Sequence, residues 1–468
     1  MAFIRKIKKK SGTYLAKVES YREGGKVKQR VLEYIGKAED YDMEGNPKIF
    51  GNIEIEKVHK YGDYQVLHQI SEKLGLVKLF SSDGSNDSHE LCYILLLIYT
   101  QLVERQALYK LPSYVDLSCL GEILGFSEIS TRQLYEAIDR LEKMNFEEVE
   151  QIIVKNIENQ FPQLDLKQGL ILDVTDTYFK GKNAIWKSRK GKDGKREKLV
   201  QIALAITQQG GFPLKQKTYE GNINNIKIFE DLMLDLKALG YDTLILDRGL
   251  NSAKILKELQ LISQQVITGL KFTAGFRKYV DEIKREDIFQ PQNMVMLTKI
   301  TVFVKQVSYQ EGSLLIIYNP EQETALRIKA MQDAEKYDKE TIKYKGYSLI
   351  YHSTNLDARA VVKTYFDKDT VEKAFKNIKD VIGINPLRKH RIDRINAHVK
   401  ICYMAYAILA YMEQKLKPLN ISASRALELM QGLYSVTIHD KKTKQSFDKT
   451  VIIKNTQSKI LDALECSV

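Results

Sequence analysis

The chain has few of the residues that build thiolate metal sites or disulfide-stabilised folds. Only four of its 468 residues are cysteines, namely Cys92, Cys119, Cys402 and Cys466, and none of them forms a Cys-x-x-Cys pair. Zinc ribbons and disulfide frameworks need cysteines at short, paired spacings. The sequence therefore argues against both and indicates a reducing compartment.

Long apolar segments are also missing. Apolar runs such as Leu91 to Tyr99 are too short for a bilayer, because a transmembrane helix needs about 20 apolar residues. Phe3 and Ile4 are followed by basic residues, with no apolar core of a signal peptide. No internal repeat or low-complexity tract is present. These absences predict a soluble cytoplasmic protein with no membrane partner.

The sequence does have an excess of positive charge. It contains 72 Lys and Arg against 60 Asp and Glu, a net charge of +12. The segment ending at Lys37 has eleven Lys or Arg and three Glu, a net +8 of that total. Solvated lysines would explain an even excess, whereas this concentration favours a polyanionic partner such as nucleic acid.

Residues 1–60 are expected to form a basic β-rich, DNA-binding unit. Apolar and basic residues alternate from Phe3 to Tyr34, and Gly24-Gly25 separates two such runs, which predicts a β-hairpin or a three-strand meander. A two-stranded ribbon can enter the major groove of DNA or lie along its phosphates. An ordinary capping sheet with a lysine-rich outer face would show the same pattern.

Residues 61–160 are expected to be helical, with a possible role in recognising DNA ends. Leu134, Ile138 and Leu141 follow a capping pair, Ser130 and Thr131, at helical spacing. Several short helices would suit a helix-turn-helix module. A small helical bundle without any DNA-binding role fits equally well.

Residues 161–415 are expected to form a mixed α/β domain. Strands at 169–174, 199–207 and 214–219 precede a helix at 225–239, a second apolar run ending at Asp247, a helix at 252–259 and a strand at 265–270. This order of elements is ribonuclease-H-like. A β-rich insertion is expected at about 271–346, before a strand at 347–351 and a helical stretch at 360–380.

The last part of the chain is expected to continue the domain and then add a small unit. A long helix at 395–414 ends the α/β domain. Residues 416–468 would form a small C-terminal region with strands near 434–439 and 450–454 and a closing helix. The fold class predicted for the whole chain is thus α/β, with a basic β-hairpin unit and a helical domain before the mixed sheet.

Three acids are the candidate metal ligands. Asp173 and Asp247 each close a Leu-Ile-Leu-Asp tetrapeptide, and an apolar run of this length reads as a buried strand that would hold its final aspartate at the edge of a sheet. Glu372 lies in the lysine-rich helical stretch. Hard divalent cations such as Mg²⁺ prefer oxygen ligands and keep positions open for water and phosphate. The trio therefore points to phosphodiester chemistry.

Each acid also has a plainer interpretation. Asp176 lies three residues beyond Asp173 and is an alternative ligand. Asp247 suits a turn before Arg248-Gly249, and Glu372 suits the first turn of a helix, where the dipole favours an acid. The last two roles are compatible with metal binding.

The residues around Glu372 form a polar helical face. Tyr365 lies seven residues before the acid, Lys368 four before it and Lys379 seven after it, so a continuous helix would place all four on one side. Beside a metal, such lysines would neutralise phosphate oxygens.

The spacing Tyr-x2-Lys-x3-Glu-x6-Lys resembles the Y-x2-R-x3-E-x6-K signature of cut-and-paste DDE transposases from bacterial insertion sequences. Nearly the whole chain shares this likeness. Its further segments are Asp173-Val174-Thr175, Gly191 to Arg196, Gly221-Asn222, Asp247-Arg248-Gly249 and Arg394-Ile395-Asn396-Ala397-His398. Lys368 stands where the signature has arginine, and its ammonium cannot give the bidentate grip of a guanidinium.

The resemblance implies a catalytic domain that binds two Mg²⁺ or Mn²⁺ ions through Asp173, Asp247 and Glu372. It implies that Tyr365, Lys368 and Lys379 contact DNA phosphates near the cleaved end. The partners would be double-stranded DNA, both the terminal inverted repeats and the target, with a homodimer in the synaptic complex. The protein would act in the bacterial cytoplasm and associate with the nucleoid when it is bound to DNA.

The predicted function is therefore DNA transposition, with metal-dependent cleavage at the ends of an insertion sequence and strand transfer into target DNA. Two alternatives remain: a ribonuclease-H-like nuclease that cuts without joining, and a catalytically silent, transposase-derived DNA-binding protein. The basic loop 187–198 would follow the DNA backbone or lie in solvent. His398, among apolar neighbours on its helix, is expected to be structural.

Overall fold

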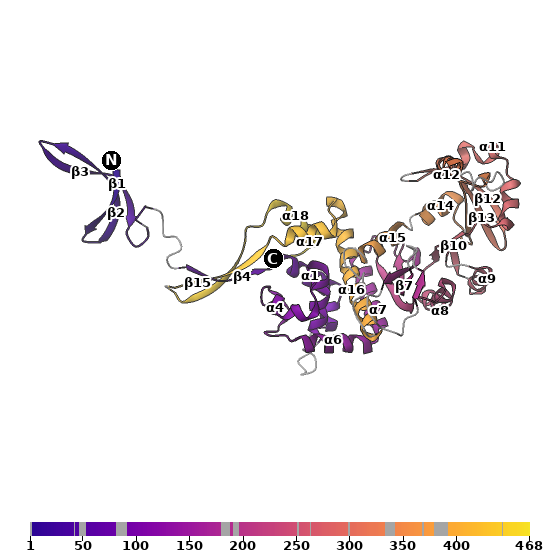
Figure 1. The fold of residues 1–468 in the computed structure, drawn as a ribbon, viewed down its shortest axis with the longest axis horizontal. Helices are drawn as coiled ribbons and strands as arrows, with labels where there is room; N and C mark the ends of the chain where they lie inside the picture. Colours follow the sequence, from indigo (N-terminus) through magenta and orange to yellow (C-terminus); the bar gives the residue numbers. More distant parts are fainter. Residues whose placement is uncertain are drawn as a thin grey trace.

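The computed structural model has an extended shape, with a small sheet at one end that is separated from the main body (Figure 1). It describes residues 2–41, 43–45, 53–80, 91–178, 188–190, 196–249, 252–262, 264–297, 300–332, 342–366, 369–378, 392–441 and 443–468. A narrow three-stranded ribbon leads from the small sheet to the body, where helices and a large sheet pack together.

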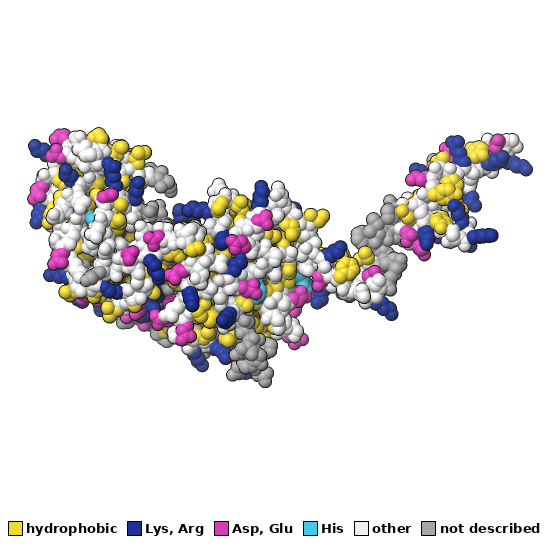
Figure 2. Space-filling view, turned by 180° about the vertical axis from the view of Figure 1, so that it is seen from behind, with side chains coloured by type: hydrophobic (Ala, Val, Ile, Leu, Met, Phe, Trp, Pro, Cys, Tyr) yellow, Lys and Arg dark blue, Asp and Glu magenta, His cyan; other side chains and the backbone are white. Residues whose placement is uncertain are grey.

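The N-terminal sheet is an antiparallel meander. Its strands are β1 (Ala2–Lys9), β2 (Gly12–Glu23) and β3 (Lys26–Lys37). Gly24 and Gly25, at the β2–β3 turn, both have positive φ, 57° and 76°, a conformation that a tight hairpin requires and glycine adopts without strain. The predicted meander is confirmed, and Lys and Arg side chains stand out along its surface (Figure 2).

The next strand, β4 (Ile53–Lys60), does not join this sheet. It pairs with β15 (Tyr434–Asp440), which in turn pairs with β16 (Gln445–Thr450). The units expected at 1–60 and 416–468 therefore share one sheet. The strand expected at 450–454 is wrong in position, because the apolar pair that suggested it, Ile452 and Ile453, lies outside the ladder and is exposed, Ile452 by 92%.

The helical domain follows, as the periodicity predicts. Its helices are α1 (Gly62–Lys73), α2 (Leu76–Phe80), α3 (Cys92–Val103), α4 (Leu111–Val115), α5 (Leu120–Leu124), α6 (Thr131–Lys143) and α7 (Phe146–Gln160). Ser130 caps α6 in a reciprocal capping box with Gln133, which satisfies two amides that the helix itself leaves unpaired. The expected apolar positions on α6 are buried, including Leu134 and Leu141.

The large mixed sheet has the order β8-β7-β5-β9-β10 at its centre, which confirms the ribonuclease-H-like fold. The strands are β5 (Gly169–Tyr178), β6 (Ser188–Lys190), β7 (Arg196–Thr207), β8 (Pro213–Glu220), β9 (Thr243–Leu246) and β10 (Gln265–Leu270). β7 is antiparallel to both of its neighbours in this order, β5 and β8, whereas β5, β9 and β10 run parallel to one another. Helices α8 (Asn225–Ala238) and α9 (Ala253–Leu261) connect them.

The insertion extends this sheet instead of forming a separate β subdomain. It contains α10 (Arg277–Asp281), α11 (Arg285–Ile288), β11 (Met294–Met296), β12 (Thr301–Tyr309), β13 (Gly312–Tyr318) and α12 (Pro320–Gln332). β13 pairs with β14 (Tyr347–His352), and β14 pairs antiparallel with β10. β13 is an internal strand, with β12 on one side and β14 on the other, and its residues from Leu314 to Tyr318 are buried on both faces of the sheet.

A long buried helix joins the sheet to the helical domain. The C-terminal helices are α14 (Ala358–Phe366), α15 (Asp369–Lys376), α16 (Ile392–Leu416), α17 (Ala423–Met430) and α18 (Asn455–Leu464). α16 contacts α3, α6 and β8. At its start, the Arg394 guanidinium donates to both carboxylate oxygens of Asp139 on α6, each at 2.8 Å. His398 lies beside Cys402 in this helix, as expected for a structural residue.

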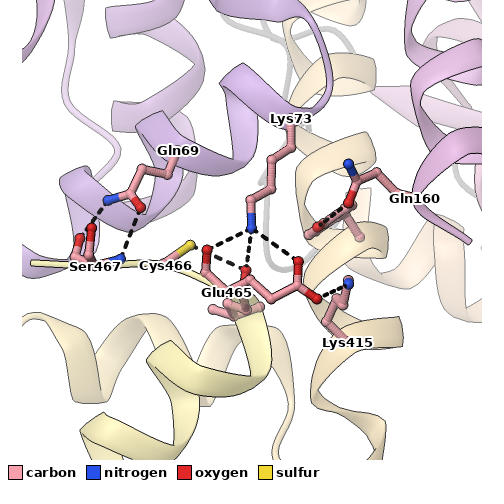
Figure 3. A network of polar contacts seen from close by, with 9 residues as sticks. Gln69, Lys73, Gln160, Lys415, Glu465, Cys466 and Ser467 are labelled. Atoms are coloured by element: carbon pink, nitrogen blue, oxygen red, sulfur yellow. Dashed lines mark hydrogen bonds and ion pairs between the residues drawn. The ribbon is translucent and has the colours of Figure 1, made fainter.

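The C-terminal residues are fixed to the helical domain by a polar network (Figure 3). Lys73 on α1 donates to two backbone carbonyls at the end of α18, at 2.7 and 2.8 Å. Lys415 on α16 pairs with the Glu465 carboxylate at 2.7 Å, and this hydrogen bond lowers the pKa of Glu465. Gln69 on α1 also bonds the backbone of Ser467. Residues far apart in sequence thus hold α1, α16 and α18 together.

Glu150 gives the contact between α7 and the sheet a pH dependence. Its carboxylate is buried and accepts from the backbone amide of Gln216 on β8 at 2.9 Å, with the Lys215 ammonium 3.9 Å away. Burial raises the pKa of Glu150 to about 7, despite the opposing effects of these two partners. The folded state therefore keeps this proton to higher pH than the unfolded chain does, and stability falls as pH rises from about 4.5 to about 7.

Glu150→Gln is expected to flatten this dependence. The variant should gain stability over the wild type at pH 8, on the order of 1–2 kcal/mol, and little at pH 5, as measured by urea unfolding at both values. Glu147→Gln is the matched control, because Glu147 also faces Lys215, at 3.4 Å, but its side chain is 60% exposed. An unchanged pH dependence in Glu150→Gln would contradict this account.

Candidate active site

Asp173, in β5, and Asp247, directly after β9, occupy equivalent positions on two neighbouring central strands of the sheet. In the parallel pairing of β5 and β9, Leu172 lies beside Leu246, and Leu246 lies beside Thr268 of β10. The residues that follow, Asp173, Asp247 and Gly269, are therefore in register across three adjacent strands. Neighbouring strands lie about 4.8 Å apart, so the two aspartates are close neighbours.

Strand alternation places both carboxylates on the same face. Ile171 and Ile245, two residues before each acid, are buried in the core that includes α14, α15 and α16, whereas Leu172 and Leu246 belong to the core on the opposite face. Asp173 and Asp247 are both half-buried. Asp176 has the parity of Leu172 and lies on the opposite face, so it is not a neighbour of Asp247.

The carboxylate of Asp173 is partly oriented by the backbone. One of its oxygens accepts a hydrogen bond from the amide of Val174, the next residue, at 2.7 Å. An ionised carboxylate has two oxygens and about four acceptor positions. This bond therefore orients the group and leaves acceptor capacity for a cation.

Glu372 lies on α15, which contacts β5. Ala374 and Phe375 are buried on the aspartate side of the sheet, whereas Glu372 itself is exposed. Among the described residues, no three acidic, histidine or cysteine side chains are grouped closely enough to hold a metal ion. The structure thus brings the two aspartates together and places the third acid on an adjacent helix, outside their cluster.

Tyr365 lies directly over Gly269, the third position in the row of Asp173 and Asp247. A methyl group built on Gly269 would collide with the Tyr365 hydroxyl and would come within 2.9 Å of its Cζ. Tyr365 is 8% exposed, so it is packed in place. The other two residues of the expected polar face, Lys368 and Lys379, lie outside the described residues, as do residues 187 and 191–195 of the basic loop.

A cleft of about 250 Å³ opens at Arg248, on the side of the sheet where Leu256 and Leu270 are buried, which is opposite to the face of Asp173 and Asp247. It is lined by Arg248, Ser252, Ala253, Leu256, Leu270, Lys271, Phe276, Tyr309 and Gln310. Arg248 directly follows Asp247, and Lys271 directly follows β10. Both side chains are exposed, and neither forms an ion pair with another residue that the structure describes. The cleft combines two available cations with two aromatic rings.

A family model described as "Transposase DDE domain" matches residues 165–408, which is 244 of the 468 residues. The chain belongs to this family of DDE transposases. The transposase also matches, over residues 4–60, a model described as "IS1634 family transposase, N-terminal domain". The family, enzyme class and transposase function expected from the sequence are confirmed. DDE transposases as a class use divalent metal ions.

Solved structures similar to the transposase are distant. A "Cryo-EM structure of piggyBac transposase synaptic complex with hairpin DNA (SNHP)" has 11% identity and a TM-score of 0.45, covering 79% of this chain and 78% of that one. "Mos1 transposase paired-end complex with left transposon end" has 12% identity and a TM-score of 0.16, covering 39% and 73%. The comparison with curated proteins gave no match.

In the described part of the transposase, helices that could cross a membrane are absent.

Three residues of this site were missed by sequence reasoning alone. Gly269 is one of 26 glycines, and only the register of β10 identifies it as the neighbour of Asp247. In the sequence, Arg248 is the middle residue of Asp247-Arg248-Gly249, and Lys271 is the first residue of the expected insertion. A signal was available, because both cations lie within two residues of the ends of adjacent strands, Arg248 after β9 and Lys271 after β10.

Proposed function

We propose that the transposase cleaves the ends of an insertion sequence with Mg²⁺ or Mn²⁺ and joins them to target DNA, using Asp173, Asp247 and Glu372. The observation that carries this proposal is the register of Asp173 and Asp247 on one face of two adjacent central strands. A cationic cleft opens near the same strand ends, toward the other face of the sheet. Metal-dependent DNA cleavage needs anionic oxygen ligands for the metal and cations near the phosphates. The region around the ends of β9 and β10 offers both kinds of group.

The donor set fits hard divalent cations. The aspartates offer only oxygen, and no cysteine or histidine accompanies them among the described groups. We propose that two ions bind here and that Glu372 completes the set, since α15 already contacts the strand of Asp173. When bound, such ions lower the pKa of water and stabilise the leaving oxygen of a phosphodiester.

The chain's own residues would position the DNA strand. The Asp173 carboxylate, oriented by the Val174 amide, and the Asp247 carboxylate would bind the metal ions next to the scissile phosphate. Tyr365 would offer its hydroxyl next to them, over Gly269. We assign Arg248 and Lys271 to neighbouring phosphates, and we keep Lys368 and Lys379 as further phosphate contacts. Because a free 3′-OH can then act as nucleophile in the same place, cleavage and joining need no covalent protein intermediate.

We propose that the other units recognise and pair the DNA ends. The basic meander of β1 to β3 would bind DNA, and the helical domain would contribute to end recognition. Two copies would pair two terminal inverted repeats in a synaptic homodimer. All four cysteines are free thiols, which supports action in a reducing cytoplasm.

The phosphate role of the cleft predicts a salt-dependent effect. Arg248→Ala combined with Lys271→Ala should weaken DNA binding about tenfold or more at moderate salt, because two phosphate contacts are lost. The slope of log affinity against log salt concentration, measured by fluorescence anisotropy, should become shallower by roughly 1.8. Lys257→Ala, on the exposed face of α9, is the matched control and should leave the slope unchanged. An unchanged slope in the double variant would remove the cleft from the DNA path.

The joining step separates transposition from simple cleavage. Purified protein is incubated with a pre-cut DNA end bearing a 3′-OH and with a supercoiled target plasmid, in Mg²⁺ or Mn²⁺. Joined products support the proposal. Cleavage of an uncut end without any joining would instead make the protein a nuclease, and end binding without either reaction would make it a silent DNA-binding protein.

A further inference from the structure

The ribbon formed by β4, β15 and β16 has two chemically different faces. Pairing in the ribbon places Val436 beside Val58, and Ile438 beside both Ile55 and Phe447. Residues opposite each other in antiparallel strands share a face, as do alternate residues along a strand. We define the apolar ribbon face by seven side chains that this register places together: Ile53, Ile55, Val58, Tyr434, Val436, Ile438 and Phe447.

The opposite face is polar and internally bonded. Thr437 donates to Asp448 across the strands at 2.6 Å, and His439 lies 3.0 Å from the Ser446 hydroxyl. Lys57 lies on the same side and faces Glu122 of α5 at 3.9 Å. The ribbon therefore has the alternating pattern of a sheet with one face in water and one face against a hydrophobic partner.

No such partner is present in the described part of the chain. Ile55, Val58 and Phe447 are 59%, 53% and 42% exposed, and none of the seven side chains belongs to either hydrophobic core. In Figure 1, β4 and β15 run outward from the helical domain, and hydrophobic side chains are visible on this ribbon in Figure 2. Contiguous exposed apolar surface of this kind marks an interaction site.

We propose that the apolar ribbon face binds the same face of a second copy of this chain. DNA suits it less well, because the central strand of the face offers only Tyr434, Val436 and Ile438, and the charged residues lie at the two ends, Lys60 and Asp440, and on the outer strand, where Lys449 pairs with Val436. Stacking two ribbons antiparallel about a two-fold axis brings Asp440, at the tip of one, toward Lys60, at the base of the other, where Lys60 also pairs with Glu104 of its own chain at 3.0 Å. A two-fold interface must be self-complementary in this way, and stacked sheets with apolar inner faces are a standard packing.

The size of the face sets the strength of this contact. Three strands about 4.8 Å apart and about seven residues long, at about 3.3 Å per residue, give a footprint of roughly 300 Å² per copy. Stable dimers bury about 800 Å² per partner. The ribbons alone should therefore give a reversible dimer with a dissociation constant in the micromolar range or weaker, present before DNA is added.

This inference names the surface of the homodimer proposed above, but it is tested without DNA or metal. The oligomeric state of the full chain is measured by sedimentation velocity from 1 to 100 μM. We expect a shift from monomer toward dimer with concentration. Phe447→Glu should weaken association at least about a hundredfold, since each dimer would bury two unpaired carboxylates.

A matched control places the same charge on the other side of the same strand. Thr450→Glu is exposed and has the parity of Asp448, so it should associate like the wild type. A wild type that stays monomeric up to 100 μM overturns the proposal, as does equal association of Phe447→Glu. A loss in both variants would also overturn it, because the apolar face would then have no special role.

Cross-linking tests the two-fold geometry. Ile438 lies near the centre of the apolar ribbon face, and packed sheets are about 10 Å apart. Ile438→Cys should give covalent dimers with a bismaleimide that spans about 10–13 Å, whereas Thr437→Cys, on the polar face, should not. The native cysteines give little background, since three are buried. Dimers from both variants, or from neither, would contradict this arrangement. DNA cleavage does not enter either measurement, so a failure of the proposed chemistry would leave these outcomes readable.

Discussion

Asp247→Asn is expected to reduce DNA cleavage at least about a thousandfold. Replacing a carboxylate by a neutral amide removes the negative charge that holds a divalent cation, and this is worth several kcal/mol in the transition state. The change keeps the shape of the side chain, so the fold should be preserved. Asp173→Asn and Glu372→Gln should give losses of the same order, measured as single-turnover cleavage of an end-containing duplex in Mg²⁺.

DNA binding separates this loss from a folding defect. End affinity of the three variants should stay within about threefold of the wild type, because the cationic contacts remain. Asp242→Asn is the matched control: Asp242 is exposed and lies at the other end of β9, next to Thr243. Turnover equal to the wild type in Asp247→Asn or Glu372→Gln would remove that residue from the site.

Gly269→Ala is expected to lower cleavage about ten- to a hundredfold. The new methyl group would occupy the space of the Tyr365 hydroxyl, so either the ring or the sheet edge beside Asp247 must shift. Small displacements of positioning groups have costs of this size. The measurement is single-turnover cleavage at saturating DNA, together with the melting temperature.

Two further variants distinguish positioning from general damage. Gly275→Ala is the control, since its methyl group would meet only Thr273 Oγ1, at 3.8 Å. Adding Tyr365→Phe to Gly269→Ala removes the nearest colliding atom and should restore part of the activity. If Gly269→Ala cleaves DNA like Gly275→Ala, the contact between Tyr365 and Gly269 has no part in the reaction.

Local patterns were sufficient for much of the fold. The meander at Gly24-Gly25, the capped helix after Ser130 and the strand that ends directly before Asp247 all depend on neighbours in sequence, such as turn residues, caps and short apolar runs. Local sequence signals predicted these elements correctly, because the local conformational preference and the final structure agree there. The strand of Asp173 differs, because β5 continues to Tyr178 in its pairing with β7. The shift of the last strand away from Ile452 shows the limit, since an apolar pair alone does not reveal whether a ladder partner is present.

Pairings between distant segments were not readable. β4 pairs with β15 across more than 370 residues, and β13 joins the main sheet through β14, so neither the shared ribbon nor the extended sheet follows from any one segment. The importance of Gly269 depends likewise on register, because a glycine in a strand is unremarkable until Tyr365 is found against it.

By itself, the sequence determined the chemistry of this transposase: the acids at the ends of apolar runs, the basic amino-terminal strands and the spacing around Glu372. The tertiary structure alone decided which of these groups meet. It aligned Asp173 with Asp247, placed Asp176 on the other face, and set Arg248 and Lys271 around one cleft. The physical reason is that side-chain identity and local periodicity are properties of short segments, whereas strand register and burial depend on contacts between segments far apart in the chain.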